Sequence, residues 1–281
     1  MRILVWALWL AVAPAAAADI VVGQSAPLTG GNAELGNDIR NGALAYFRKV
    51  NEAGGLPQGK LKLVTLDDRN ETKLSADNTQ KLVADDAVVA LFGYASSTLS
   101  IPAMPSVVDG RVPFFAPFTG ADAIRQQNEY VYTVRATYAD EIQKIITFWG
   151  SLGSTKVTVL HYDDAVGKQN FDTVAQVLTK YNRKPVSVPI KRNVAITDAD
   201  VAAVVASDPS VLVVTTLYAP AAQMVKRLKA AHRASMVTSL SFAGASQLAK
   251  ALGPDAAGAY RVVTTSTLGS DATTAATSAS V

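Results

Sequence analysis

The sequence predicts an α/β fold built as two doubly wound lobes with parallel sheets. Short, continuous apolar runs alternate with amphipathic stretches of helical period along most of the 281 residues. Continuous apolar strands are typical of parallel sheets that helices cover on both faces. The alternation breaks at the irregular stretch 118–137 and then starts again. We therefore expect two lobes of four or five strands each, although a single sheet of at least nine strands fits the same pattern.

Periodicity and turn residues define the individual elements. The helix at 36–52 places Ile39, Ala43 and Val50 on one face, and Gly54-Gly55 ends it. In the first half we expect strands at 20–23, 61–66, 88–92 and 112–116, and helices at 36–52, 75–85 and from Ser96-Ser97-Thr98 onward. In the second half we expect a helix around Ile142 and Trp149, strands at 157–160, 186–190, 211–215, 236–241 and 260–265, and helices at 167–181, 198–206, 218–231 and 246–252. We accordingly place the lobes at 19–120 and 121–265.

Both ends of the chain differ from the body. Arg2 precedes an apolar run of about ten residues and then a string of alanines, which is the pattern of a secretory signal peptide. A membrane anchor is the rival interpretation, but spanning a bilayer takes roughly 20 apolar residues. We therefore expect a signal peptide at 1–18, cleaved after Ala18. Residues 266–281 are polar and low in complexity, and we expect them to be disordered.

The composition argues against several kinds of chemistry. The sequence has no cysteine, so it can form no disulfide, no thiolate metal site and no cysteine nucleophile. Its two histidines leave little for a zinc site or for histidine acid–base catalysis. The formal net charge of +3 comes without a basic cluster, so we expect no nucleic-acid partner. We also expect no cofactor, no metal ion and a monomeric state.

Two carboxylate pairs are candidates for enzyme chemistry. Asp67-Asp68 and Asp163-Asp164 each follow an expected strand, where open α/β sheets place their sites. Such pairs could bind a metal ion or act as acid and base. The simpler interpretation as turn residues and helix caps is favoured, because aspartate is common at both. The sequence has neither a G-x-G-x-x-G nor a G-x-S-x-G motif, and we expect no enzyme.

Two loops offer polar groups at neighbouring strand ends. The segment 93–98 places hydroxyl groups where a strand ends and a helix begins, and backbone N–H groups there suit a carboxylate. If Ser97 merely caps its helix, it satisfies those N–H groups itself. Pro117-Phe118-Thr119 follows the next strand and either forms a simple turn or offers a carbonyl, a hydroxyl and an N–H. Because the loops are adjacent, together they favour a binding site.

With these loops, the chain resembles the periplasmic solute-binding proteins of ABC importers, in the leucine/isoleucine/valine-binding branch. The resemblance runs from about Ile20 to Val263, and the order and spacing of its segments make it specific. The matching segments are Leu28-Thr29-Gly30 with Gly36 and Asn41-Gly42, 51–56, Asp67-Asp68, Gly93 with Ser97-Thr98, 112–121, 134–138, Asp163-Asp164 with Gly167, and Tyr218 with Gln223-Met224.

The resemblance implies a type I periplasmic binding protein fold, whose two lobes close like a hinge. It implies a periplasmic receptor that captures a small amino-acid-like solute for a membrane permease. By position, Ser97 and Thr98 would receive the ligand carboxylate, while the Phe118 carbonyl and Thr119 would receive its ammonium group. Tyr218 would close over the ligand from the second lobe, and Tyr138 would lie near the hinge.

The chain departs from this family in three places. Where branched-chain binders offer an acidic residue to the ammonium, Ser246 stands nearest here, and Asp122, Asp163 or Asp164 would have to substitute. Val166 stands where an aromatic residue is common. The solute therefore stays open among amino acids, short amides, ureas and aromatic acids. The family's return to the first lobe after 260–265 is missing, which predicts a C-terminally truncated chain whose first lobe exposes apolar surface.

Other functions stay open at this stage. The same lobes occur in receptor ectodomains, so the chain could be the ligand-sensing subunit of a signalling receptor. An exported hydrolase would use one of the carboxylate pairs, and a non-functional truncated product would bind nothing.

Overall fold

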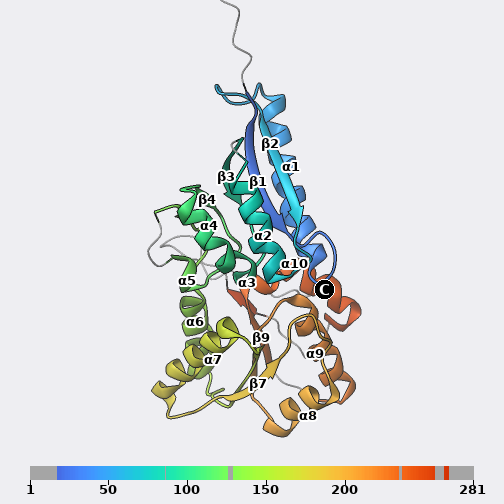
Figure 1. The fold of residues 1–281 in the computed structure, drawn as a ribbon. Helices are drawn as coiled ribbons and strands as arrows, with labels where there is room; N and C mark the ends of the chain where they lie inside the picture. Colours follow the sequence, from blue (N-terminus) through green and yellow to red (C-terminus); the bar gives the residue numbers. More distant parts are fainter. Residues whose placement is uncertain (1–17, 86, 126–128, 234–235, 257–262, 266–281) are drawn as a thin grey trace, which may run out of the picture.

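The computed structural model describes residues 18–85, 87–125, 129–233, 236–256 and 263–265, which form two sheets of five strands each (Figure 1). The first sheet has the strand order β2-β1-β3-β4-β5, and the second has the order β7-β6-β8-β9-β10. The strand pairs within both sheets are parallel. Numbered within its own half of the chain, each sheet has the doubly wound order 2-1-3-4-5. The predicted α/β class with parallel sheets is confirmed.

The first half of the chain supplies the first sheet. Its strands are β1 (Ile20–Ala26), β2 (Leu61–Asp67), β3 (Val88–Phe92), β4 (Phe114–Phe115) and β5 (Val131–Tyr132). Its helices are α1 (Ala33–Glu52), α2 (Thr72–Val83), α3 (Ser97–Ser100), α4 (Met104–Asp109) and α5 (Asp122–Arg125), with the 3-10 turn η1 (Ile101–Ala103) between α3 and α4.

The second half repeats the alternation. Its strands are β6 (Val157–Tyr162), β7 (Val186–Ile190), β8 (Val211–Thr215), β9 (Met236–Leu240) and β10 (Val263–Thr265). Its helices are α6 (Tyr138–Ser151), α7 (Ala165–Leu178), α8 (Asp198–Ser207), α9 (Tyr218–Ala230) and α10 (Ala245–Leu252), with 3-10 turns η2 (Thr179–Tyr181), η3 (Ser241–Ala243) and η4 (Gly253–Ala256).

The structure differs from the sequence-based expectation mainly between the two halves. The stretch 118–137, expected to be irregular, contains α5 and β5, which have four and two residues and are too short to show a period. Since β5 pairs with β4, the first sheet extends beyond residue 120, where the sequence suggests the lobe boundary. The expected signal peptide, apart from Ala18, lies outside the described residues, as do the tail at 266–281 and the start of the strand expected at 260–265.

In both sheets an edge strand is less covered than the central strands. All residues of β6 and β8 are buried, whereas β2 has no fully buried residue and β7 has three exposed ones. Beside β2, Leu44 and Tyr46 of α1 are 39% and 64% exposed. A groove between α1 and β2 is lined by Leu44, Phe47 and Leu63 among others. Apolar side chains of the first half are therefore exposed along this groove.

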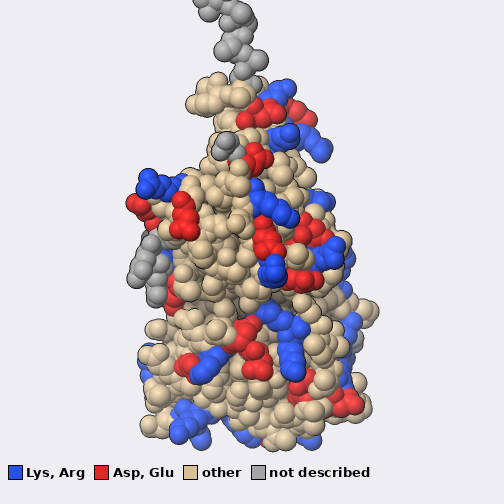
Figure 2. Space-filling view, viewed as in Figure 1, with Lys and Arg blue, Asp and Glu red and all other residues tan. Residues whose placement is uncertain are grey.

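The surface carries charges of both signs. Figure 2 shows lysine and arginine interspersed with aspartate and glutamate over the face that it presents, from the first half to the second. Many of these charges are paired within the chain, such as Lys73 with Asp77 on α2 and Lys168 with Asp172 on α7. Within the described ranges, no helix combines the length and the apolar character needed to cross a membrane.

A glycine fixes the start of a helix against a strand end at the same place in each half. A Cβ atom on Gly36 of α1 would overlap the carbonyl of Pro27, and one on Gly167 of α7 would overlap the backbone of Tyr162. Only glycine lets the helix backbone approach this closely. The two helices therefore leave their strands in the same geometry, and Tyr162 is held at the edge where the two sheets face each other.

Asp68, at the end of β2, is a fully buried carboxylate. It accepts hydrogen bonds from Ser25 Oγ (2.9 Å) and from the backbone N–H of Asn70 (2.9 Å). Burial raises the pKa of Asp68 to about 6, more than these hydrogen bonds lower it. Burial also acts on neighbouring Asp67, but hydrogen bonds from the Thr29 hydroxyl and from backbone N–H groups outweigh it and lower its pKa.

We expect Gly167→Ala to destabilise the protein by about 1–3 kcal/mol, the usual cost of overpacking. Gly42→Ala is the matched control, because Gly42 lies inside α1 with nothing near its Cβ position. Alanine there should stabilise the protein by roughly 0.5–1 kcal/mol. Urea denaturation of both variants measures the two changes in the free energy of unfolding. Equal stabilities of the two variants would contradict the close approach at Gly167.

Asp68→Asn should make the stability of the protein respond differently to pH. The folded state favours the protonated Asp68 carboxyl, and the stability that this contributes is fully present below 3.8, the pKa of the carboxyl in the unfolded chain. That contribution is lost as the pH rises through about 6, its pKa in the folded protein. Asparagine stays neutral, so relative to the parent the variant should gain about 2 kcal/mol between about pH 4.5 and about pH 7.5. Urea denaturation at both pH values measures this gain, and a difference that does not change with pH would argue against the raised pKa.

Candidate functional site

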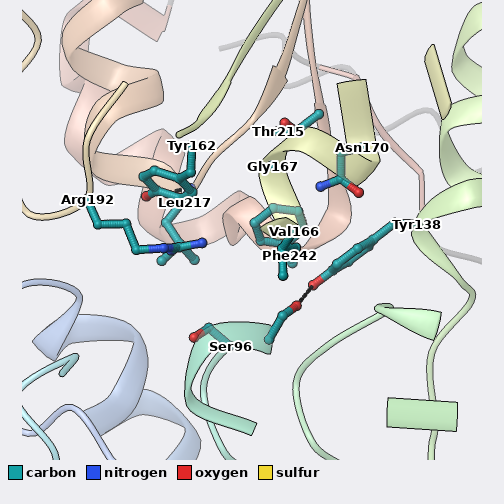
Figure 3. A pocket seen from close by; sticks show the side chains of 11 residues that line it. Ser96, Tyr138, Tyr162, Val166, Gly167, Asn170, Arg192, Thr215, Leu217 and Phe242 are labelled. Atoms are coloured by element: carbon teal, nitrogen blue, oxygen red, sulfur yellow. Dashed lines mark hydrogen bonds between the residues drawn. The ribbon is translucent and has the colours of Figure 1, made fainter. Parts of the chain in front are cut away.

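A pocket lies between the two sheets, beyond the carboxyl ends of their strands (Figure 3). Ser96 and Ser97 follow β3, Tyr162 ends β6, and Thr215 ends β8. This is where open parallel sheets place their sites, because the strand order reverses there and the loops diverge. Among these side chains the pocket leaves only about 10 Å³ of space, room for about one water molecule. A solute between the two sheets therefore needs the halves to move apart.

Side chains of α1, of α10 and of the loops after β2 and β7 bridge the two halves. The bridging pairs are Asn70 Nδ2 to Asn193 Oδ1 (2.8 Å), Gln247 Nε2 to Asp38 Oδ2 (2.7 Å), and Lys250 Nζ to Glu34 Oε1 (2.6 Å). The first two are hydrogen bonds between part-buried groups, and the third is an exposed ion pair that adds little to stability. These bridges hold the two halves close together around the pocket.

Three hydroxyl groups from separate segments meet at one wall of the pocket. Ser97 Oγ lies 2.6 Å from Thr119 Oγ1 and 3.0 Å from Tyr138 OH, and Tyr138 OH donates to Thr119 Oγ1 at 3.3 Å. Ser96, not Ser97, caps α3, since its Oγ accepts from the Leu99 N–H at 3.3 Å. The interpretation of Ser97 as a helix cap is therefore wrong. Its hydroxyl faces the other two, and we call Ser97, Thr119 and Tyr138 the hydroxyl cluster.

On the opposite side, a paired cation borders the pocket. Arg192 Nε donates to Asp164 Oδ2 at 2.6 Å, and its guanidinium lies 3.7 Å from the centre of the Tyr162 ring. Asp164 also caps α7 by accepting from the Gly167 N–H at 2.8 Å. Burial raises the pKa of the Tyr162 hydroxyl, which therefore stays protonated at neutral pH. Arg192 thus brings its charge to the pocket already balanced by Asp164.

The buried carboxylate of Glu141 positions an aromatic wall of the pocket. Its two oxygens accept from the Ser241 backbone N–H (2.7 Å) and from Ser241 Oγ (2.6 Å), with Arg135 nearby at 3.7 Å. Burial raises the pKa of Glu141 despite these partners. The contacts hold η3 in place, and Phe242 of η3 packs on Tyr138 with ring centres 4.8 Å apart.

The six residues that the sequence selects are not all on the pocket wall. Ser97 and Tyr138 line it, and Thr119 lies directly behind them as the third hydroxyl. Thr98 does not line the pocket and bonds Ser96 Oγ at 3.1 Å. Phe118 lies under the Arg135 guanidinium, 4.2 Å from ring centre to Cζ, and also falls outside the lining.

Tyr218 lies between the two halves but away from the pocket lining. It begins α9 and is buried, and burial together with the charges of Glu34 and Asp38 raises its pKa. Since Glu34 and Asp38 belong to α1, the tyrosine faces the first half of the chain. In this arrangement its neighbours are acidic side chains of the protein.

No acidic residue lines the pocket among the residues that the structure describes. Ser246, which the sequence places nearest to the expected ammonium partner, is exposed on α10 and does not line the pocket. Asp163 is exposed, Asp164 is engaged with Arg192 and the start of α7, and Asp122 lies in α5 outside the lining. An ammonium group in this pocket would lack a carboxylate partner.

The carboxylate pairs occupy structural positions. Asp67 Oδ1 accepts from the backbone N–H groups of Leu28 (2.9 Å) and Arg69 (3.0 Å), which organises the turn after β1. Asp164 is a helix cap, as described above, so the favoured interpretation of turn residues and caps accounts for both. His161 is bonded at both ring nitrogens, to the Tyr162 carbonyl and to Ser187 Oγ. In the described part of the chain, no three His, Asp or Glu side chains gather into a metal-binding group.

Val166 was singled out from the sequence as a departure from the family, and most of the other second-half lining was missed. Val166, Asn170, Leu217 and Phe242 line the pocket together with the strand-end residues Tyr162 and Thr215. One feature of the sequence could have indicated Asn170. It is a polar residue on the buried face of α7, which also carries Gly167 and Val174. Arg192 lies on the loop after β7 and Phe242 lies in η3, and no local pattern in the residues placed either of them at the pocket.

Comparisons with known proteins agree with this architecture. A family model described as "Periplasmic binding protein" matches residues 19–281. An amino acid binding protein of Pseudomonas aeruginosa is 29% identical over 174 residues, 61% of this chain and 46% of that protein. Leu/Ile/Val-binding protein homolog 3 of Brucella melitensis is 27% identical over 170 residues, 60% of this chain and 46% of that protein.

A solved structure of a similar protein has the same fold. The crystal structure of a possible leucine/isoleucine/valine-binding protein from Rhodopirellula baltica SH 1 superposes with a TM-score of 0.82 at 27% identity. The match covers 90% of this chain and 70% of that one. The two curated relatives are matched over about half of their length, 46% in each case.

The matched region includes both sheets and every lining residue of the pocket. The resemblance read from the sequence is confirmed: the chain belongs to the periplasmic binding protein family.

Proposed function

We propose that the protein is the solute-binding receptor of an ABC importer, which captures a small amino-acid-like solute between its two halves. In this proposal the sheet β2-β1-β3-β4-β5 and the sheet β7-β6-β8-β9-β10, each with its helices, act as two lobes. The lobes close on the solute by hinge motion and present it to a membrane permease. The receptor works in the periplasm, in keeping with the family and with the secretory pattern of residues 1–18.

The hydroxyl cluster carries this proposal. Ser97, Thr119 and Tyr138 are at least 95% buried, with exposed fractions of 4%, 1% and 5%, yet Ser97 and Tyr138 line the pocket. Hydroxyl hydrogens rotate freely, so these groups can exchange their mutual bonds for bonds to a carboxylate. A carboxylate bonded by hydroxyl groups in a small pocket forms strong charge-assisted hydrogen bonds. The cluster thus supports recognition of the carboxylate end of a solute.

The relatives support the chemical class of the solute. The relatives named above are described as binding amino acids or Leu, Ile and Val. The apolar side chains of Val166, Leu217 and Phe242 give the pocket a surface for the carbon skeleton of such a solute. The solute remains broader than the branched-chain amino acids in this proposal, because the pocket lining contains no carboxylate to pair with an ammonium group.

Screening by thermal shift tests the proposal directly. The purified chain without its expected signal peptide would be melted with leucine, isoleucine, valine, asparagine, aspartate, short amides and aromatic acids. A solute at 100 times its Kd stabilises the folded state by about 2.7 kcal/mol, which is a clear rise in Tm. If no solute of this panel shifts the melting of a cooperatively folded chain, the receptor proposal fails.

Ser97→Ala and Thr119→Val should each weaken binding of the solute found in that screen by roughly 1–3 kcal/mol, because each leaves a buried polar group of the complex unpaired. Ser151→Ala is the control, since Ser151 is exposed at the end of α6 and far along the helix from Tyr138. Isothermal titration calorimetry measures the three Kd values. Binding by both pocket variants at the strength of the control would show that the hydroxyl cluster does not hold the solute.

A further inference from the structure

Two buried side chains of the pocket each have a polar atom that makes no hydrogen bond within the protein. Asn170 on α7 is 3% exposed and Thr215 at the end of β8 is 1% exposed. Asn170 Nδ2 and Thr215 Oγ1 make no hydrogen bond, and both residues line the pocket. Figure 3 shows Asn170 and Thr215 on the side of the pocket that lies across from Ser96. A buried donor without a partner is costly, so native proteins keep such groups rarely and for a reason.

Nearby polar groups of the same half are satisfied, which makes these two stand out. Thr158 Oγ1 bonds Ser207 Oγ at 2.7 Å, and Thr216 Oγ1 donates to the Leu217 carbonyl at 3.2 Å. Other unpartnered atoms, such as Ser239 Oγ and Trp149 Nε1, belong to residues outside the pocket lining and carry no part of this argument.

The position of the two groups suggests which part of a solute they meet. The hydroxyl cluster lies on the wall formed by α3 and the start of α6, and Asn170 and Thr215 lie on the wall formed by α7 and β8. The apolar side chains of the lining lie with them in the same small pocket. When the halves move apart to admit a solute held by its carboxylate at the hydroxyl cluster, the other end of that solute faces Asn170 and Thr215.

We infer that Asn170 and Thr215 form a subsite for a hydrogen-bond acceptor at that distal end, so that the receptor selects a solute ending in a carboxamide or carboxylate over one with an aliphatic end. The inference rests on the proposed function and specifies its substrate class. The Asn170 amide nitrogen is a donor only, and the Thr215 hydroxyl can donate as well. Two donors beside one small space suit an oxygen atom. An aliphatic end would leave both unpaired, which is the basis of strong discrimination between isosteric ligands.

Leucine, asparagine and aspartate are suitable probes, because their side chains have the same branched shape and differ in the distal atoms. Isothermal titration calorimetry on the mature chain should give at least ten-fold tighter binding of asparagine or aspartate than of leucine. Asn170→Leu and Thr215→Val should each reduce that preference at least ten-fold. Gln169→Leu is the control on the exposed face of α7 and should keep the preference of the parent.

A second readout needs no solute. Replacing an unpaired buried polar group by an apolar group of similar shape is neutral or stabilising. The Tm of ligand-free Asn170→Leu and Thr215→Val should therefore equal or exceed that of the parent. A clear fall in both Tm values would mean that the two side chains serve the fold, and would overturn the inference.

The outcomes separate this inference from the proposed function. If the parent protein binds leucine at least as tightly as asparagine and aspartate, the acceptor subsite is wrong while the receptor function stands. If the folded chain binds no amino-acid-like solute, the receptor function fails and the subsite with it. The comparison of probes on the parent protein needs no variant, so a variant that fails to fold does not remove the test.

Discussion

The structure depends on one constraint, the parallel pairing of strands in an order that reverses inside each sheet. Because all strands of a sheet run the same way, their carboxyl ends lie along one edge, and the loops that follow β1 and β3, or β6 and β8, diverge there. The two sheets turn these edges toward each other, so that Ser97 and Thr215 border one pocket although they lie more than a hundred residues apart in the chain. Gly36 and Gly167 support this geometry by letting a helix start directly against a strand end.

The electrostatics of the pocket follow from which charges are already paired. Arg192 is balanced by Asp164 and stacks on Tyr162, and the lining contains no carboxylate among the described residues. What the pocket offers is therefore mostly neutral hydrogen-bonding groups and apolar walls. Glu141, buried and bonded to Ser241, acts outside the lining by holding Phe242 in position. Neutral donors can bind a carboxylate or an amide without the desolvation cost of burying a bare charge on the protein.

Stability and binding make different demands on the second half of the chain. Its strands β6 and β8 are completely buried, and most of their polar groups are bonded, yet Asn170 and Thr215 keep unpaired polar atoms beside the pocket. Such groups cost stability in the free protein and regain it when a partner arrives. In the first half, apolar side chains of α1 are exposed, and the edge strand β2 has no fully buried residue.

The sequence by itself determined the fold class, the position of nearly every helix and strand, and the family, because apolar periodicity and turn residues are local signals. It also pointed to Ser97, Thr119 and Tyr138, which lie at strand ends and a helix start. Only the tertiary structure showed that Ser96 rather than Ser97 caps α3, that β5 joins the first sheet, and that Tyr218 and Phe118 stand away from the pocket. It alone placed Arg192, Asn170 and Phe242 around one pocket. These outcomes depend on which side chains meet across long separations, and packing decides that, whereas periodicity reports only which face of an element is apolar.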